Sequence, residues 1–312
     1  MKYAYYPGCS SETLSSGYEV SLQAVSHLLG LELVTIPDWN CCGATEYMAV
    51  SRLASYAVAA RNLALVPEDC HTVVASCSAC FLNLKRVEVV MTDYPEVGEK
   101  VNEAMAAGGL SYGPGRLQIR HILDVFLRDI GLEHIQEQVT KPLSDLQVAP
   151  YYGCMLVRPT SCFGQPEYPV GMDTLLGALG AVPLDFSLRG YCCGGHLPQI
   201  KADTGFEIIH RILNNAEKEG ANCIAVACPV CQLNLDLYQR DVNLRYGTNF
   251  EFPVLFFTQL MGLAFGLKEE ELGLDLEAMT GGRLLGEARS QHDTSGYPGD
   301  GEALGGNREE IS

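Results

Sequence analysis

Ten of the thirteen cysteines in this 312-residue chain form a five-cysteine pattern that occurs twice. Each copy has a single cysteine, then an adjacent Cys-Cys-Gly, then a Cys-x-x-Cys, and 34 residues separate the last two groups in both copies. The first copy consists of Cys9, Cys41, Cys42, Cys77 and Cys80, and the second of Cys154, Cys192, Cys193, Cys228 and Cys231. Thiolates at such spacing are ligands of zinc and of iron–sulfur clusters. The pattern therefore predicts two metal or cluster sites in one chain.

The composition favours metal binding by these cysteines over disulfide formation. No charged segment followed by an apolar one marks a secretory signal, and the most apolar stretch, 252–267, is shorter than the roughly 20 residues of a membrane-spanning helix. We therefore expect a cytoplasmic protein without a transmembrane segment, in which thiols stay reduced. A formal net charge of −17 argues against a nucleic acid partner and leaves protein partners and small substrates.

The number of cysteines in each copy narrows the kind of site. Five exceed the four ligands of a tetrahedral zinc ion or of an ordinary [4Fe–4S] cluster, so either one is spare or the site needs an additional or bridging thiolate. The adjacency of Cys41 to Cys42 and of Cys192 to Cys193 favours the second reading. One [4Fe–4S] cluster together with one zinc site is the alternative. The closely spaced cysteine run of ferredoxins is absent, so another protein must supply the electrons.

The two halves of the chain share more than cysteines. The stretch 73–84 recurs as 224–235, and from the Cys-Cys pair onward the copies keep a constant offset of 151 residues. Duplication of one structural unit is the simplest explanation. We expect a first domain over residues 1–145 and a second over residues 146–267. Residues 268–312 hold eleven acidic and four basic residues with many glycines, which predicts a flexible, largely disordered acidic tail.

The elements that must position the cysteines follow from apolar spacing. The predicted strands are 3–6, 31–36, 72–75, 148–152, 182–186 and 223–227, and the predicted helices are 19–29, 44–65, 121–131 and 255–266. Alternation of strand, loop and helix predicts an α/β fold of two similar Rossmann-like domains with parallel sheets. Each cysteine group directly follows a strand, so the groups of one copy should meet at the carboxyl edge of their sheet.

These motifs resemble a known family. Asn40-Cys41-Cys42-Gly43, Tyr191-Cys192-Cys193-Gly194 and the Pro-Gly-Cys that ends at Cys9 resemble the CCG-domain (cysteine-rich) proteins, and in length and layout the B subunit of heterodisulfide reductase. The resemblance covers residues 1–267. It implies two non-cubane [4Fe–4S] clusters, each held by the five cysteines of one copy, at the interface of two similar CCG domains.

The resemblance also implies an activity and its partners. The chain would be the catalytic subunit of a heterodisulfide reductase-like complex, which reduces or forms a disulfide between the two clusters. Electrons would arrive from a ferredoxin-like subunit of the HdrC type and a flavin-containing subunit of the HdrA type. The disulfide belongs either to a small molecule or to a sulfur-carrier protein. The alternative is an iron–sulfur electron-transfer subunit of a hydroxy-acid or quinone-linked dehydrogenase, because CCG domains also occur in such systems.

Three other side chains are candidates for a role in the site, and a fourth, His121, is expected to lie in the core. His196 follows the second Cys-Cys-Gly-Gly directly and is the candidate catalytic residue, since a histidine can protonate a leaving thiolate near neutral pH. Arg158 and Arg189 lie close to the second copy and could bind an anionic group of a substrate. His121 lies on an apolar helical pattern and is expected to be a core histidine.

Three cysteines lie outside the repeated pattern. Cys70 and Cys223 are expected to be small buried hydrophobic residues. Cys162 lies in the loop 159–164, near enough to Cys154 in sequence that its thiol could face the second site.

Overall fold

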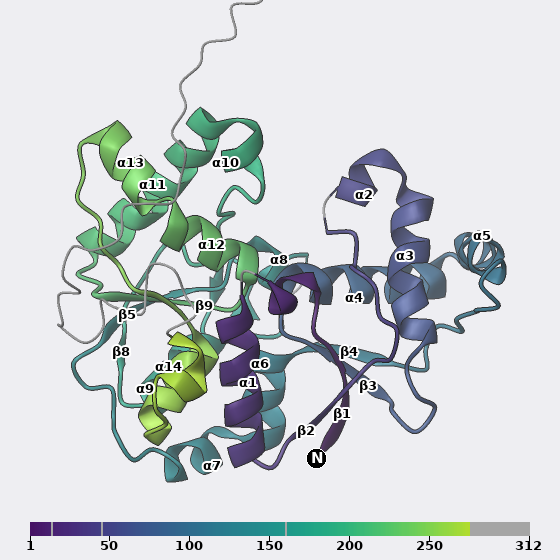
Figure 1. Cartoon of the computed structure of the whole chain (residues 1–312), viewed down its shortest axis with the longest axis horizontal. Helices are drawn as coiled ribbons and strands as arrows, with labels where there is room; N and C mark the ends of the chain where they lie inside the picture. The colour runs from purple at the N-terminus through teal and green to yellow at the C-terminus, as the bar shows by residue number, and fades with distance from the viewer. Residues whose placement is uncertain (14, 45, 160, 275–312) are drawn as a thin grey trace, which may run out of the picture.

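The computed structural model describes residues 1–274 except 14, 45 and 160, and it contains two α/β halves (Figure 1). Each half is built around a parallel sheet of four strands. The strands of the first sheet are Lys2–Tyr6 (β1), Glu32–Thr35 (β2), Thr72–Ala75 (β3) and Gln118–His121 (β4). Those of the second are Gln147–Tyr151 (β5), Val182–Pro183 (β8), Cys223–Val226 (β9) and Val254–Phe256 (β10). A short antiparallel pair joins Gly164–Gln165 (β6) to Tyr168–Pro169 (β7).

The two sheets have the same topology. Their strand orders are β2-β1-β3-β4 and β8-β5-β9-β10, so the first strand of each half lies between the second and the third. The register is also equivalent, because Ala4 pairs with Val73 in the first sheet and Ala149 with Ile224 in the second. The predicted duplicated α/β fold with parallel sheets is confirmed.

Burial on both faces explains why the central strands are continuously apolar. β1 is buried from Tyr3 to Tyr6, and all four residues of β9 are buried, as expected for parallel strands covered by helices on both sides. All six predicted strands are present. The structure adds β4 and β10, which run directly into helices, so the apolar spacing of those helices hides them.

Helices connect and cover the strands. In the first half they are Ser16–Leu28 (α1), Glu46–Val50 (α2), Arg52–Ala64 (α3), Ser78–Asp93 (α4), Pro95–Ala106 (α5), Ile122–Val125 (α6) and Leu132–Glu137 (α7), with a 3-10 turn Cys9–Glu12 (η1) and a π-helical turn Phe126–Ile130 (η2). In the second half they are Cys154–Val157 (α8), Gly171–Ala178 (α9), Leu197–Ile200 (α10), Ala202–Lys218 (α11), Pro229–Leu237 (α12), Gln239–Tyr246 (α13) and Phe257–Phe265 (α14), followed by a 3-10 turn Glu270–Leu272 (η3).

The predicted helix 44–65 is divided into α2 and α3. Ser51 separates them, and its Oγ accepts a hydrogen bond from the backbone N–H of Ala54 at 3.3 Å as the N-cap of α3. A serine that caps the second helix cannot also continue the first one, because its backbone is extended.

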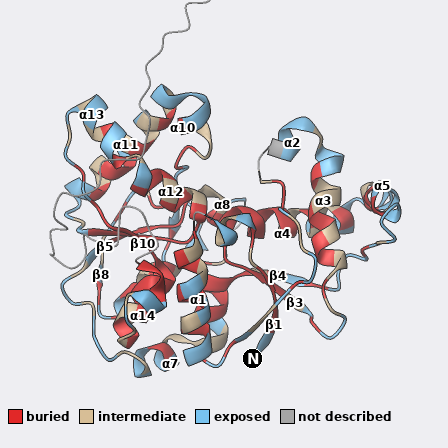
Figure 2. Ribbon diagram, in the orientation of Figure 1, coloured by how far each residue is buried: buried red, intermediate tan, exposed pale blue. Residues whose placement is uncertain are grey.

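The two halves share one hydrophobic core. Helix α1 of the first half packs against α14 of the second, and both turn buried faces toward each other in Figure 2. Ser21 and Thr258 hydrogen-bond through their hydroxyls at 2.7 Å in this interface. Tyr18 stacks on Phe256 with ring centroids 4.0 Å apart. The halves are therefore held in one fixed relation, which brings the carboxyl ends of β3 and β9 together.

The predicted acidic tail starts at residue 268, but its first residues pack on the fold. Residues 268–274 include η3 and bury Leu272 and Leu274, and Gly273 lies against Gly17 of α1. The remainder of the predicted tail, 275–312, lies outside the described residues.

Candidate metal centre

All ten patterned cysteines lie at the carboxyl edges of the sheets, as predicted. The first cysteine set is Cys9, Cys41, Cys42, Cys77 and Cys80, which follow β1, β2 and β3. The second cysteine set is Cys154, Cys192, Cys193, Cys228 and Cys231, which follow β5, β8 and β9. All thirteen cysteines fall within the described residues and are free thiols. Three loops of one sheet thus bring five thiols together in each half.

The sulfurs of the first set lie in pairs. The Sγ atoms of Cys41 and Cys9 are 3.8 Å apart, and those of Cys42 and Cys80 are 3.5 Å apart. In the described part of the chain, no three His, Cys, Asp or Glu side chains surround a single point as ligands of one ion do. The arrangement is therefore one of neighbouring thiol pairs in each loop cluster.

Glycines let the first loop of each half approach the sulfurs. Gly8 has a φ of +80°, and a Cβ there would lie 3.1 Å from the Sγ of Cys80. Gly153, at the equivalent position, has a φ of +69°, and its Cβ would lie 2.9 Å from the Sγ of Cys231. A side chain at either position would be strained and would press on a thiol. Both loops therefore need glycine at this position, so that no side chain fills the space beside the sulfur.

Buried tyrosines hold the Cys-Cys-Gly loops. The hydroxyl of Tyr6 donates to the carbonyl of Asn40 at 2.6 Å, and that of Tyr151 donates to the carbonyl of Tyr191 at 2.7 Å. Burial raises the pKa of Tyr6 and of Tyr151, and the surrounding cysteines raise both further. Both phenols therefore remain protonated donors and fix the residue before each cysteine pair.

The first cysteine of each adjacent pair is favoured as a thiolate, and in the second set Cys228 is favoured as well, because a hydrogen bond from Cys231 lowers its pKa. Hydrogen bonds from Cys42 and Cys9 hold the pKa of Cys41 well below its usual range, and bonds from Cys154 and Cys193 do the same for Cys192. The backbone N–H of Gly194 also donates to the Sγ of Cys192 at 3.3 Å. Since the thiolate is the form that ligates metals, Cys41 and Cys192 are prepared for ligation.

The two sets meet across the interface between the halves. Cys77 and Cys228 are buried, and each thiol perturbs the pKa of the other across the interface. Beside them, the hydroxyl of Ser78 donates to the carbonyl of Ala227 at 3.1 Å. The two sites are therefore adjacent, which the sequence pattern alone did not show.

His121 is buried near this junction. Its Nδ1 accepts a hydrogen bond from the backbone N–H of Leu123, and its ring meets Phe81 edge-on. Burial lowers the pKa of His121 to about 4, so the ring is neutral at physiological pH. The predicted core histidine is confirmed, although it ends β4 and caps α6 instead of lying on a helical face.

A cavity of about 310 Å³ adjoins the second cysteine set. All five cysteines of that set line it, together with His196, the apolar side chains of Met155 and Val230, and Ser78 from the first half. The structure thus places the predicted catalytic histidine beside these thiols. A larger cavity, about 690 Å³, lies between residues 141–146 and the end of α14 and touches none of the ten cysteines.

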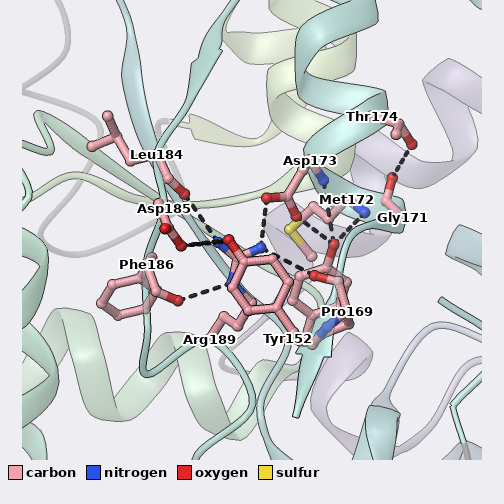
Figure 3. Close-up of polar contacts among 11 residues, drawn as sticks. Tyr152, Pro169, Gly171, Met172, Asp173, Thr174, Leu184, Asp185, Phe186 and Arg189 are labelled. Atoms are coloured by element: carbon pink, nitrogen blue, oxygen red, sulfur yellow. Dashed lines mark hydrogen bonds and ion pairs between the residues drawn. The ribbon is translucent and has the colours of Figure 1, made fainter. Parts of the chain in front are cut away.

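Arg189 does not bind an anionic substrate group, because its guanidinium is buried and fully used inside the protein (Figure 3). It donates to the carbonyls of Phe186 and Pro169 at 2.9 and 3.1 Å and pairs with the carboxylate of Asp173 at 2.7 Å. Its own carbonyl accepts from the backbone N–H groups of Tyr152 and Gly153. The prediction was wrong because a lone arginine in sequence gives no sign of its burial, and its role is to fix the loop before Cys154.

Arg158 lies at the protein surface. Its Nη1 donates to the carbonyl of Gly190 at 2.6 Å, and it lines a groove of about 230 Å³ with Lys85 and Arg86.

The three additional cysteines behave differently from the patterned ones. Cys70 and Cys223 are buried, as predicted. Burial raises the pKa of Cys162 to about 11, and this residue is not part of the cavity lining at the second set. Its carbonyl accepts a hydrogen bond from Arg128 instead.

The fold and site define a duplicated α/β protein with one thiolate set at the carboxyl edge of each sheet. The family model described as a cysteine-rich domain, CCG, matches residues 3–85 and 148–236, and the chain belongs to this family. The predicted family is confirmed.

Relatives support the same class. The chain is 34% identical, over 88% of its length and 95% of the relative, to the 8-methylmenaquinol:fumarate reductase membrane anchor subunit of Wolinella succinogenes. It is 31% identical, over 89% of its length and 94% of the relative, to the B subunit of the ferredoxin:CoB-CoM heterodisulfide reductase of Methanosarcina mazei. The cysteine-rich domains and these relatives indicate an iron–sulfur oxidoreductase component similar to the B subunit of heterodisulfide reductase.

A solved structure shares the fold. The crystal structure of a hypothetical protein from Helicobacter pylori superposes with a TM-score of 0.69 at 16% identity, covering 88% of this chain and 51% of that chain.

None of the helices among the described residues combines the length and apolar character needed to cross a bilayer.

Proposed function

We propose that this chain is the catalytic iron–sulfur subunit of a heterodisulfide reductase-like complex, in which a disulfide is reduced or formed between two non-cubane [4Fe–4S] clusters. One observation carries the proposal. Two complete five-thiol sets meet through Cys77 and Cys228, beside a cavity that residues of both halves line. A disulfide has two sulfur ends, so two adjacent sites suit it better than one.

The residues of both sites fit such clusters. Each set offers five sulfur donors, at least one of which is favoured as a thiolate, and a glycine in each first loop keeps side chains away from the sulfurs. The ten patterned cysteines would be the ligands. When bound, each cluster supplies or accepts one electron, and the pair matches the two electrons of an S–S bond.

The chain's own residues would bind the substrate and handle protons. Reduction converts one disulfide, two electrons and two protons into two thiols, so a proton donor is needed at the cavity. His196 lines the cavity and is the candidate donor to a leaving thiolate. Met155 and Val230 line the same space with apolar side chains.

The electrons would come from other subunits. We assign this role to a ferredoxin-like subunit of the HdrC type and a flavin-containing subunit of the HdrA type, within a cytoplasmic complex. The disulfide is either a small molecule or part of a sulfur-carrier protein.

Anaerobic purification followed by iron, sulfide and zinc analysis and EPR tests the cluster assignment. Two clusters predict about eight irons per chain. Four irons or fewer, or zinc in both sites, would contradict the proposal.

His196→Gln should lower the rate of disulfide cleavage with iron content unchanged, whereas His134→Gln, at an exposed histidine, serves as a matched control. Equal rates in both variants would remove His196 from the mechanism.

A second function is favoured by one specific observation. The relative at 34% identity is named as a subunit of a quinol:fumarate reductase, so the CCG domains of this chain could pass electrons in a quinone-linked dehydrogenase. The two functions differ in which compound can oxidise the protein after it has been chemically reduced. Oxidation by disulfides supports the reductase, and oxidation only by quinones, with no thiol released, supports electron transfer.

A further inference from the structure

Beyond the cysteines, the repeated motif contains an asparagine in each half. Asn83 and Asn234 each lie three residues after the second cysteine of a Cys-x-x-Cys, on α4 and α12. Both side chains are buried, with 4% and 0% exposure. Most buried polar groups are hydrogen-bonded, so the partners of each amide indicate its role.

Each amide nitrogen contacts the Cys-Cys-Gly loop of its own half. Nδ2 of Asn83 donates to the carbonyl of Ala44 at 2.8 Å and lies 3.6 Å from the Sγ of Cys42. Nδ2 of Asn234 donates to the carbonyl of Gly195 at 2.8 Å and lies 3.4 Å from the Sγ of Cys193.

These contacts fix the orientation of the amide. The carbonyl oxygens of the loop accept and cannot donate, so the side-chain nitrogen, and not the oxygen, must face the loop and its sulfur. One N–H binds the carbonyl of Ala44 or Gly195, and the other faces the second cysteine of the adjacent pair. There it is shared between that cysteine's Sγ and its carbonyl, which lies 3.4 Å from Nδ2 in the first half and 3.1 Å in the second. N–H groups that donate to ligating sulfurs raise the reduction potential of a cluster, because they stabilise negative charge on the sulfur.

The oxygens of the two amides have different surroundings. Nη1 of Arg86 donates to Oδ1 of Asn83 at 3.4 Å. In the second half, the residue 151 positions later is Leu237, and Oδ1 of Asn234 has no hydrogen-bond partner among the described residues. A cation on the oxygen polarises an amide and strengthens its N–H as a donor. The two otherwise equivalent sites therefore differ in one charged contact.

We propose that Asn83 and Asn234 are positioning residues that each donate an N–H to the sulfur of Cys42 or Cys193, and that Arg86 makes the first site the more easily reduced of the two. This rests on the proposed function, since it requires a cluster in each set. The two sites would then differ in potential although their ligands are equivalent.

An exchange of the differing residues tests the proposal. Arg86→Leu gives the first half the residue of the second, and Leu237→Arg does the reverse. Lys85→Leu is the control, because it removes a neighbouring cation from the same helix that does not contact Asn83. The readouts are iron per chain and the two midpoint potentials, measured by EPR during anaerobic redox titration of the purified chain.

The expected result is that Arg86→Leu lowers one potential, Leu237→Arg raises the other, and Lys85→Leu shifts neither. Asn234→Asp, which exchanges the donor for an acceptor, should lower a potential or halve the iron content. Equal shifts in Arg86→Leu and Lys85→Leu would overturn the hydrogen-bond mechanism, as would unchanged potentials in both exchange variants. A wild-type chain without two clusters would refute the proposed function itself, which is a distinct outcome.

Discussion

Arg189 gives the sharpest test of how the second half positions its cysteines. Its side chain is 1% exposed, and the partner carboxylate of Asp173 is 18% exposed. Arg189→Met removes the cation from this carboxylate, which keeps its hydrogen bond from Tyr152, and takes the side-chain donor away from three carbonyl groups, those of Pro169, Leu184 and Phe186. Loss of one partner of a buried ion pair costs about 3–5 kcal/mol of unfolding free energy. That is a large part of the stability of an ordinary domain.

The first half offers a matched control. Position 38 is the equivalent of Arg189 by the 151-residue offset, and there Asp38 pairs with Arg61. In this pair the arginine is 33% exposed and the aspartate 78% exposed. An exposed pair contributes about 0–1 kcal/mol, so Arg61→Met should be nearly neutral.

Urea unfolding of the anaerobically purified protein, followed by circular dichroism, measures both variants. Arg189→Lys should be intermediate, because lysine keeps the charge but not the planar set of donors. Arg189→Met should also lose iron preferentially from the second set, since the carbonyl of Arg189 holds the loop before Cys154. Equal destabilisation by Arg189→Met and Arg61→Met would refute the reasoning.

Three further predictions address the site loops, the buried histidine and the interface. Gly153→Ala should lose about half of the bound iron, because its Cβ would lie 2.9 Å from a sulfur of the second set, whereas Gly30→Ala, at a similar φ with no atom nearby, should keep it. Burial lowers the pKa of His121 from 6.5 to about 4, so only the unfolded chain binds a proton between these values. The unfolding free energy of the wild type should therefore fall by up to about 1.4 kcal/mol per pH unit below pH 6.5, and His121→Phe should remove that part of the slope in a pH series of urea melts. Ser21→Ala and Thr258→Val should each lower the unfolding free energy by about 1–3 kcal/mol, and the double variant should lower it by less than the sum of the two. If the two losses add exactly in urea melts, the hydroxyl groups do not interact.

Local patterns were sufficient for much of the fold. The predicted strands at 3–6 and 223–227 are buried on both faces in the structure, so their apolar residues follow directly from parallel pairing. The helix expected at 44–65 was predicted as one piece, because spacing of apolar residues does not reveal that Ser51 caps a second helix. β4 and β10 were not predicted, because each runs directly into a helix, and the helices predicted at 121–131 and 255–266 already included their last residues.

By itself, the sequence determined the ten patterned cysteines, their grouping into two equivalent sets and the α/β class. These properties depend on residue type and spacing along the chain, which every copy of the motif carries locally. Only the tertiary structure decided that Cys77 meets Cys228 and that Arg189 is buried. Such contacts join residues far apart in the chain or depend on burial, because packing of the two halves, and not local propensity, selects them.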